Sequence, residues 1–358
     1  YWVWIPRYAY KITSGYHSSE TGTIDVKFLK SILNITSDNT VVETTGYLPG
    51  TKDTSMYHFL HPSFQFNGDE LGFWVAKFEP SVADQTSPCY ITRSSANCNN
   101  HFLYPKFIPN SNTWVNITIY NTYHVSLLMK TNPIYGWLPK EIDTHALTNQ
   151  EWGAVAYLSK SQYGADDEIW NNSYSDFKTG CSGPSVSATS QPSCLGYEYN
   201  TEDGVKASTT HSIYGVYDMS GGTHERTIAT YNFLEGSSGF TNIEIKAIEK
   251  KYITNYHTEY SDMLGGVGMA YDTSIYGDAV YETSYNAYRY SPTGTIGTMS
   301  GTWYSDYSHL PYLNRPWFVR GADSTSGNVA GAFAYHVGYG SPFNNSSFRL
   351  ALFSLKQI

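Results

Sequence analysis

The sequence predicts an α+β protein with short strands, few helices and extensive ordered loops. Its 358 residues include 33 Tyr, 9 Trp and 30 Gly, while only 15% are charged. Aromatic residues favour strands and glycines favour turns, whereas a low content of Lys and Glu disfavours long helices. The length is also sufficient to bury a large core.

Short strands are predicted towards both ends of the chain. Residues 24–28 alternate apolar Ile, Val and Phe with polar positions, which is typical of a half-buried strand. A second strand is expected at residues 73–78. Closing strands are expected near residues 317–320 and 348–354.

Two helices are predicted in the middle of the chain. Residues 119–130 carry apolar side chains at a helical spacing. Residues 148–159 give a stronger signal, because Thr148 and Glu151 have the spacing of a capping box and the apolar residues that follow line one face. Beyond residue 165 helix signals largely stop, and loops rich in Gly, Ser, Tyr and Asn dominate.

Charge and hydropathy exclude several classes of partner. The net charge of -9 is diffuse, so no basic surface is expected to bind nucleic acid. No stretch of 18 apolar residues is present, so no membrane span is predicted. Because the sequence starts without Met at an apparent strand, we expect that an N-terminal leader or anchor precedes it.

The four cysteines form two local pairs in polar loops. Cys89 and Cys98 lie in one loop, and Cys181 and Cys194 lie in another. The even count and local spacing predict two disulfides and an extracellular, cell-surface or virion location. The alternative is a zinc site with four cysteine ligands, which the lack of C-x2-C spacing disfavours.

The segment 212–222, followed by His224 and Glu225, carries the most informative motif. It reads Gly215-Val216-Tyr217-Asp218-Met219-Ser220-Gly221-Gly222. Small residues allow a sharp turn, and Asp218 can accept hydrogen bonds from turn amides. The motif resembles the Gly-Leu-Tyr-Asp-Met-x-Gly-Asn-x-x-Glu signature of the formylglycine-generating-enzyme (sulfatase-modifying-factor) superfamily. That superfamily has a C-type-lectin-like fold.

Further segments resemble the same superfamily in the same chain order. They are Val3-Trp4-Ile5-Pro6, the strand Phe73 to Glu79, the helix Leu147 to Ala156, Val319-Arg320-Gly321 and Ser347-Phe348-Arg349. The resemblance spans nearly the whole chain. It implies a single elaborated C-type-lectin-like, formylglycine-generating-enzyme-like domain over residues 1–358.

The residues needed for the oxidase chemistry of this superfamily are missing. Its copper oxidases use a cysteine pair in the C-terminal third, but no cysteine follows Cys194. Its iron enzymes use a histidine cluster from an additional helical domain, which has no counterpart here. We therefore expect a non-enzymatic protein without a catalytic residue. The alternative is a metal-dependent enzyme of the superfamily with an unrecognised metal site.

Carboxylates in two places have structural explanations. Asp166, Asp167 and Glu168 are expected to form a solvated turn, although a structural calcium site is the alternative. Asp218 and Glu225 of the motif are expected to tie a buried turn, since no catalytic partner is apparent.

A ligand-binding surface is predicted near the C-terminus. Residues 332–345 read as a loop between the motif anchors Arg320 and Arg349, and this arrangement resembles the variable region of diversity-generating-retroelement proteins. Tyr, His, Asn and Ser on a fixed scaffold make adaptable recognition surfaces. The predicted binding residues are Tyr304, Asp306, Tyr307, Tyr312, Asn314, Tyr335, His336, Tyr339, Ser341, Asn344 and Asn345.

The same resemblance implies the class of ligand. Variable proteins of this type bind ligands on phage tails or bacterial cell surfaces, so a protein or glycan on a cell surface is the expected partner. The alternative is that residues 332–345 are an ordinary structural loop, since Gly, Asn, Ser and Tyr are common in turns.

Overall fold

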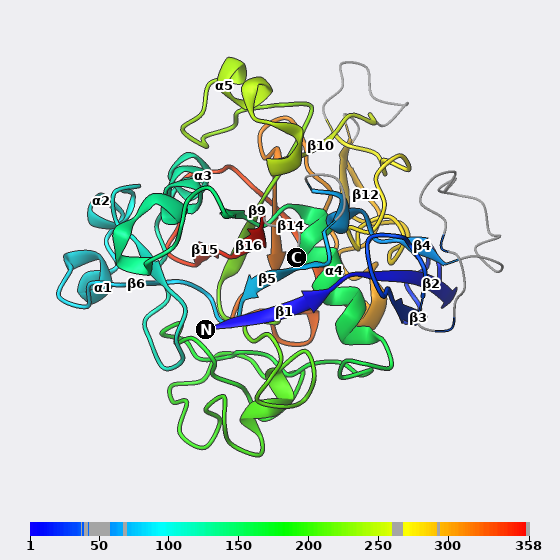
Figure 1. Cartoon of the computed structure of the whole chain (residues 1–358), viewed down its shortest axis with the longest axis horizontal. Helices are drawn as coiled ribbons and strands as arrows, with labels where there is room; N and C mark the ends of the chain where they lie inside the picture. Colours follow the sequence, from blue (N-terminus) through cyan, green and yellow to red (C-terminus); the bar gives the residue numbers. More distant parts are fainter. Residues whose placement is uncertain are drawn as a thin grey trace.

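Strands from the two ends of the chain lie in one antiparallel sheet. The computed structural model describes residues 1–36, 38, 42, 58–66, 70–259, 268–291 and 294–355. The strand order in this sheet is β1 (Trp2–Pro6), β5 (Gly72–Ala76), β16 (Leu350–Ser354) and β8 (Ile142–Ala146). β16 is therefore paired with two much earlier strands, which closes the chain into one domain (Figure 1).

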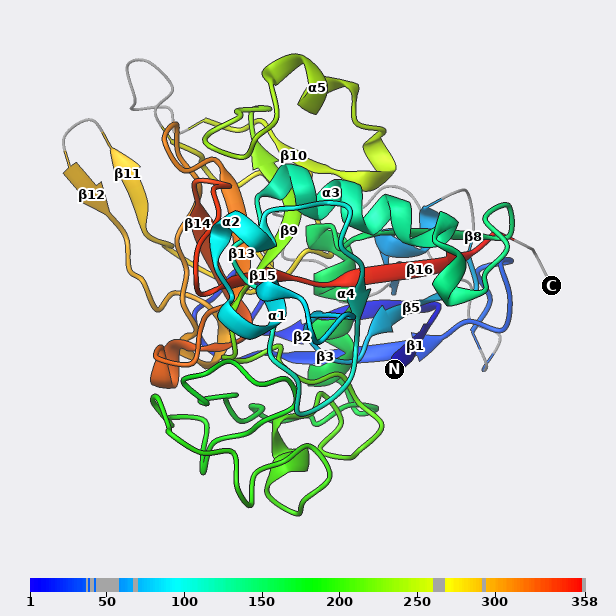
Figure 2. The ribbon, with the colours of Figure 1, turned by 90° about the vertical axis from the view of Figure 1, so that its left-hand side faces the viewer.

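A second sheet runs across the direction of the first (Figure 2). Its order is β10 (Thr254–Tyr256), β9 (His224–Tyr231), β13 (Trp317–Gly321) and β14 (Gly331–Gly338), and β15 (Ser346–Phe348) also pairs with β9. β13 is antiparallel to β9 and β14, whereas β10 and β15 are parallel to β9. The closing strands predicted near 317–320 and 348–354 are thus present as β13 and β16.

Both predicted helices are present. α3 (Ile119–Leu128) begins at the first predicted residue, and a 3-10 turn at Met129–Thr131 follows it. α4 (Asn149–Lys160) begins directly after Thr148, the N-cap residue of the predicted capping box. In that box the amide of Glu151 donates to Thr148 Oγ1 (3.3 Å), and the amide of Thr148 donates to the Glu151 carboxylate (2.8 Å).

α4 is central because it contacts both ends of the chain. Its Trp152 Nε1 donates to the carbonyl of Ala332 in β14 (2.8 Å), and Tyr8 in β2 (Tyr8–Ser14) donates its hydroxyl to the carbonyl of Ala154 (2.7 Å). At Gly153 a Cβ atom would lie 2.0 Å from the carbonyl oxygen of Gly277. A glycine is therefore required for the loop to approach the helix this closely.

The remaining regular elements are short. The strands are β3 (Thr23–Phe28) and β4 (Phe59–Leu60), which flank β2, then β6 (Ser81–Val82), β7 (Pro105–Lys106), β11 (Arg289–Ser291) and β12 (Gly294–Ile296). The helices are α1 (Pro88–Thr92), α2 (Ser95–Cys98) and α5 (Asn242–Ala247). Short 3-10 helices occupy Pro62–Gln65, Pro133–Tyr135, Gly204–Ala207, Lys250–Tyr252, Trp303–Ser305 and Gly327–Val329. The structure is thus mixed α and β, with mostly sheets and few helices.

Loops dominate after α4, as predicted, although α5 and the eight-residue strand β9 interrupt them. Residues 161–223 form the green lobe at the bottom of Figure 1. Within the described residues, no helix has the length and apolar character that crossing a membrane requires.

The signature motif forms a buried turn held by carboxylates. Asp218 lies in the left-handed region (φ +63°), and its carboxylate accepts from the amide of Gly180 (2.9 Å) and from Asn172 Nδ2 (2.8 Å). Glu79 accepts from the amide of Thr223 at 2.8 Å. At Gly222 (φ +68°) a Cβ atom would stand 2.9 Å from the Glu79 carboxylate. Asp218 therefore ties the turn, as expected.

Arg349 neutralises this acidic centre. Its Nε donates to the Glu225 carboxylate (2.8 Å), and its Nη atoms donate to the carbonyls of Ala76 (2.7 Å) and Tyr217 (2.8 Å). Burial raises the pKa of Glu225 to about 7, while the charge and hydrogen bonds of Arg349 oppose this rise. Burial also raises the pKa of Glu79 well above its usual range, with further contributions from Asp218 and Glu225. These carboxylates are structural.

Both predicted disulfides are present. Cys89 pairs with Cys98 and joins α1 to α2, while Cys181 pairs with Cys194 across a loop of the lower lobe. Each closes a short local loop, so the main effect is to restrict the unfolded chain within those loops.

A buried histidine bridges two carboxylates beside α4. His145 of β8 contacts Glu151 through Nε2 (2.8 Å) and Asp143 through Nδ1 (3.1 Å). Burial lowers the pKa of His145, but the Glu151 charge and the hydrogen bonds to both carboxylates outweigh burial and raise it to about 9. The charged imidazole thereby joins the start of α4 to the first sheet.

We predict that both disulfides form in the mature protein. Replacing Cys181 and Cys194 together by Ser should lower the free energy of unfolding by about 2–4 kcal/mol, because the unfolded chain regains loop entropy. Non-reducing peptide mapping and denaturant unfolding measure the two effects. Recovery of all four cysteines as free thiols from the wild type would contradict the prediction.

Replacing His145 by Gln should lower the free energy of unfolding by about 3–5 kcal/mol at pH 7, because the buried Glu151 carboxylate loses its charged partner and Asp143 retains Lys130 alone of its two cationic contacts among the described residues. The pKa of His145 in the folded protein lies above its value in the unfolded chain. The stabilisation by the charged imidazole is therefore complete below about pH 6.5 and is lost as pH rises through about 9. Denaturant unfolding of the wild type and the variant at pH 6 and pH 10 measures this difference in free energy. The exposed His257→Gln is the control, and equal stability of the two variants would refute the role of the bridge.

Candidate functional site

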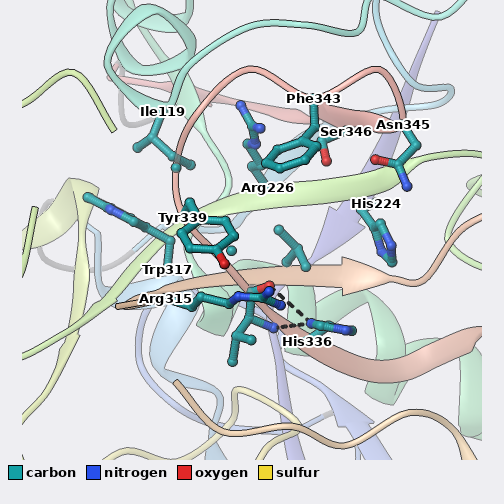
Figure 3. Close-up of a pocket in the computed structure, with 14 residues that line it drawn as sticks. Ile119, His224, Arg226, Arg315, Trp317, His336, Tyr339, Phe343, Asn345 and Ser346 are labelled. Carbon is teal, nitrogen blue, oxygen red and sulfur yellow. Dashed lines mark hydrogen bonds between the residues drawn. The ribbon is translucent and has the colours of Figure 1, made fainter. Parts of the chain in front are cut away.

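A cavity of about 210 Å³ opens between the second sheet and the segment 339–346 (Figure 3). Its lining residues are Ile119, His224, Arg226, Arg315, Trp317, Val319, His336, Val337, Gly338, Tyr339, Gly340, Phe343, Asn345 and Ser346. Aromatic, cationic and amide side chains are therefore mixed in one small space. None of these lining residues, all from the described part of the chain, is acidic.

Strand register brings the lining residues together. His224 and Arg226 are two apart on β9, so both point to one face, whereas the intervening Glu225 pairs with Arg349. Val319 of β13 lies opposite Arg226 on β9 and opposite His336 on β14. The cavity thus has a floor of three hydrogen-bonded strands.

Arg226 is buried in the cavity wall and forms no ion pair with any of the described residues. Only 3% of the residue is exposed. One Nη atom donates to the carbonyl of Ser341, while Nη1 has no hydrogen-bond partner among the described residues. Burial lowers the pKa of Arg226 to about 9. Its guanidinium is still charged at neutral pH, and it presents an unused donor.

A second arginine lies against the aromatic side of the cavity. The Arg315 guanidinium carbon is 4.4 Å from the centre of the Tyr339 ring, an arrangement typical of a cation–π contact. The Tyr339 ring is stacked against Phe343 with centroids 6.3 Å apart. Phe343 is 44% exposed, so the aromatic pair extends to the mouth of the cavity.

Two histidines, His224 and His336, line one side of the cavity, and His309 packs against His336. The rings of His224 and His336 are 5.7 Å apart, and those of His336 and His309 are 5.3 Å apart. Burial is the main cause that lowers the pKa of His336 to about 3. Electrostatic interactions with His224, His309 and Arg315 contribute to the same lowering. Burial also lowers the pKa of His224, although Asp323 opposes this. These rings are neutral at pH 7 and both donate and accept hydrogen bonds.

The cavity collects part of the predicted binding set. His336, Tyr339 and Asn345 line it, and Ser341 borders it through its carbonyl contact with Arg226. Tyr307 stacks on His336 with centroids 4.5 Å apart. These five residues from two separate segments are therefore neighbours.

Other predicted residues lie around this group. Tyr312 stacks near His309 (5.9 Å between centroids), while Asn314 and Asn344 are exposed. Tyr304 does not line the cavity, and its ring lies 6.2 Å from that of Phe333. Tyr304 is therefore not part of this site.

Tyr335 and Asp306 require a correction. Residues 331–338 form strand β14 rather than a loop, because they pair with β13. Tyr335 is fully buried, and its hydroxyl lies 2.9 Å from Ser284 Oγ. Asp306 is also buried and accepts from the amide of Phe333 (3.0 Å). Both belong to the core and do not project towards a ligand.

The sequence prediction missed three cationic or titratable lining residues, His224, Arg226 and Arg315. A signal for the first two was available, since both flank Glu225 at alternating positions directly after the signature motif. Nothing local in the sequence indicated that Arg226 would be buried or that Arg315 would stack on Tyr339.

The acidic cluster lies apart from this cavity. Asp166 forms an ion pair with Lys160 (3.0 Å) and is largely exposed. Burial, together with the smaller effect of the Asp167 charge, raises the pKa of Glu168 to about 7. Within the described ranges, no three His, Cys, Asp or Glu side chains are grouped so that they could hold a metal ion.

Comparison with known proteins adds no assignment. No protein-family model matches this chain, and no curated protein matches it.

Replacing Tyr335 by Ala should lower the free energy of unfolding by about 3–5 kcal/mol, because a buried aromatic ring is lost from the core. Tyr335→Phe keeps the ring and loses only the hydroxyl contacts with Ser284 (2.9 Å) and Tyr271 (3.4 Å), so it should lower stability by about 1 kcal/mol. Denaturant unfolding of both variants is the measurement. A Tyr335→Ala variant as stable as the wild type would show that the ring is not part of the core.

Proposed function

We propose that this chain is a non-enzymatic ligand-binding protein of a cell surface or virion, and that its ligand occupies the cavity between β9, β13, β14 and residues 339–346. The observation that carries the proposal is the unpaired, buried Arg226 in a preformed cavity with aromatic and amide walls. Such a combination of apolar surface and a few oriented polar groups is typical of ligand sites.

The scaffold supports binding with little loss of entropy. The floor of the cavity is hydrogen-bonded sheet, and Tyr339 is held between Arg315 and Phe343. Aromatic side chains that are already ordered lose little freedom when a ligand binds. A protein or a glycan on a cell surface is the proposed class of ligand.

The C-type-lectin-like, formylglycine-generating-enzyme-like fold is part of the same proposal. It is supported by the signature residues, because Asp218 and Glu225 occupy buried structural positions and Arg349 pairs with Glu225. The two disulfides suit an extracellular location. A nearby reverse transcriptase gene and an imperfect repeat of the region coding for residues 300–350 would support a diversity-generating-retroelement variable protein.

The competing function is a metal-dependent enzyme of the same superfamily. Metal analysis of the purified protein separates the two functions, because stoichiometric copper or iron would favour the enzyme.

Replacing Tyr339 by Ala should weaken ligand binding by about 1–3 kcal/mol and leave folding intact, because the ring borders the cavity and is only partly buried. Binding is measured on arrays of glycans and surface proteins, and folding by thermal unfolding. Tyr214→Ala is the matched control, since Tyr214 is 78% exposed and does not line the cavity. Equal binding by both variants would place the site elsewhere.

A further inference from the structure

The cavity has a charge pattern that selects the ligand. Two arginines line it and no acidic side chain of the described residues does. Arg226 has no carboxylate within ion-pair distance in the described part of the chain, and its Nη1 is unsatisfied although the residue is buried. A buried guanidinium without a counter-ion is unfavourable, so a bound anion would complete the site.

The carboxylate of Asp323, at the edge of the cavity, is already used by other groups. Asp323 Oδ2 accepts from Asn345 Nδ2 (2.8 Å) and lies 3.7 Å from His224 Nε2. Its other oxygen accepts from Thr325 and Ser326. Asp323 therefore orients Asn345 and His224 at the edge of the cavity and leaves Arg226 without an acidic partner.

We propose that the cavity binds the carboxylate of an acidic monosaccharide within a glycan, with Arg226 and Arg315 as the anion-binding residues. This inference rests on the proposed function and specifies its ligand. Guanidinium groups bind carboxylates through paired, charge-assisted hydrogen bonds. Arg226 supplies a donor from the cavity wall, and Arg315 adds positive charge beside Tyr339.

The remaining polar groups favour a sugar over an acidic peptide side chain. His224 Nδ1 is buried without a hydrogen-bond partner among the described residues, and neutral His336 and Asn345 lie in the same cavity. An Asp or Glu side chain offers only its carboxylate, whereas a sugar acid also carries hydroxyl groups that donate and accept. The exposed ring of Phe343, which also lines the cavity, provides an apolar surface against which a sugar ring can pack.

The volume agrees with a ligand of this size. About 210 Å³ corresponds to roughly seven waters at about 30 Å³ each, which suits one sugar ring rather than a long peptide. The mouth, marked by the exposed Phe343, allows the rest of a glycan to continue into solvent.

The test measures binding of the intact chain to glucuronate-containing oligosaccharides and to otherwise identical glucose oligosaccharides. Glutamate-rich peptides and a wider array of neutral glycans and surface proteins are measured in parallel. The glucuronate oligosaccharides should bind at least ten times more tightly than the glucose ones. Equal binding of the acidic and neutral sugars, or binding of the acidic peptides alone, would overturn the inference and leave the binding function standing. Binding to nothing on the array would overturn both.

Variants test the role of Arg226 separately from folding. Arg226→Met should weaken binding of the glucuronate oligosaccharides by roughly 10- to 100-fold, which is the effect of losing a hydrogen bond to a charged group. Because the charge is buried and unpaired, this variant should melt within a few degrees of the wild type or above it. Arg349→Met is the contrasting control and should melt well below the wild type, since Arg349 is paired with Glu225. A strongly destabilised Arg226→Met that still bound the acidic sugar would make Arg226 structural and overturn its assignment.

A second arginine variant keeps the test informative if Arg226→Met fails to fold. Arg315→Met alters a partly exposed side chain whose guanidinium stacks on Tyr339. It should weaken binding of the glucuronate oligosaccharides while binding of neutral sugars does not change. Unchanged preference for the acidic sugar in this variant would contradict the proposed anion site.

Discussion

The buried pair of Arg349 and Glu225 is the interaction on which the two sheets depend. Arg349 lies between β15 and β16, and it donates to Ala76 at the end of β5 and to Tyr217 in the signature turn as well as to Glu225 of β9. One guanidinium therefore joins the first sheet, the second sheet and the turn between them. A buried network in which every polar group has a partner is rigid. If one member is removed, its former partners remain buried without hydrogen bonds, which is strongly unfavourable.

The position of the cavity follows from these contacts of Arg349. Arg349 directly follows β15, and β15 pairs with the first residues of β9, so the segment that leads into β15 passes over His224 and Arg226. The cavity wall formed by Phe343, Asn345 and Ser346 is held against the sheet by the same pairing. The site is thus shaped by the core and not by a free loop.

Local signals in the sequence predicted the local features well. The capping box placed the start of α4, and the spacing of the cysteines gave both disulfides, because these features depend on a few neighbouring residues. β14 was mistaken for a loop because its small and glycine residues resemble turn residues, and only pairing with β13 makes it a strand. α5 was missed although Thr241 and Glu244 form a capping box, because its short span shows no apolar periodicity.

Only some residues of the candidate site could be predicted from the sequence, because the others depend on tertiary packing. Tyr, His and Asn residues near the C-terminus indicated recognition by composition, and several of them line the cavity. Whether a tyrosine lies in the core or in a cavity depends on where the strand ends: Tyr335 is buried within β14, whereas Tyr339 directly follows β14 and lines the cavity. The absence of a counter-ion for Arg226 is a property of three-dimensional packing that no spacing in the sequence expresses.

The alternation along β9 has a consequence for how such a protein can change over generations. Glu225 faces the core and its neighbours His224 and Arg226 face the cavity, so consecutive codons serve different tasks. A substitution at Glu225 would break the buried pair with Arg349, whereas a substitution at His224 or Arg226 would change the chemistry of the cavity. Under the proposed function, a single strand therefore divides architecture and specificity between adjacent side chains.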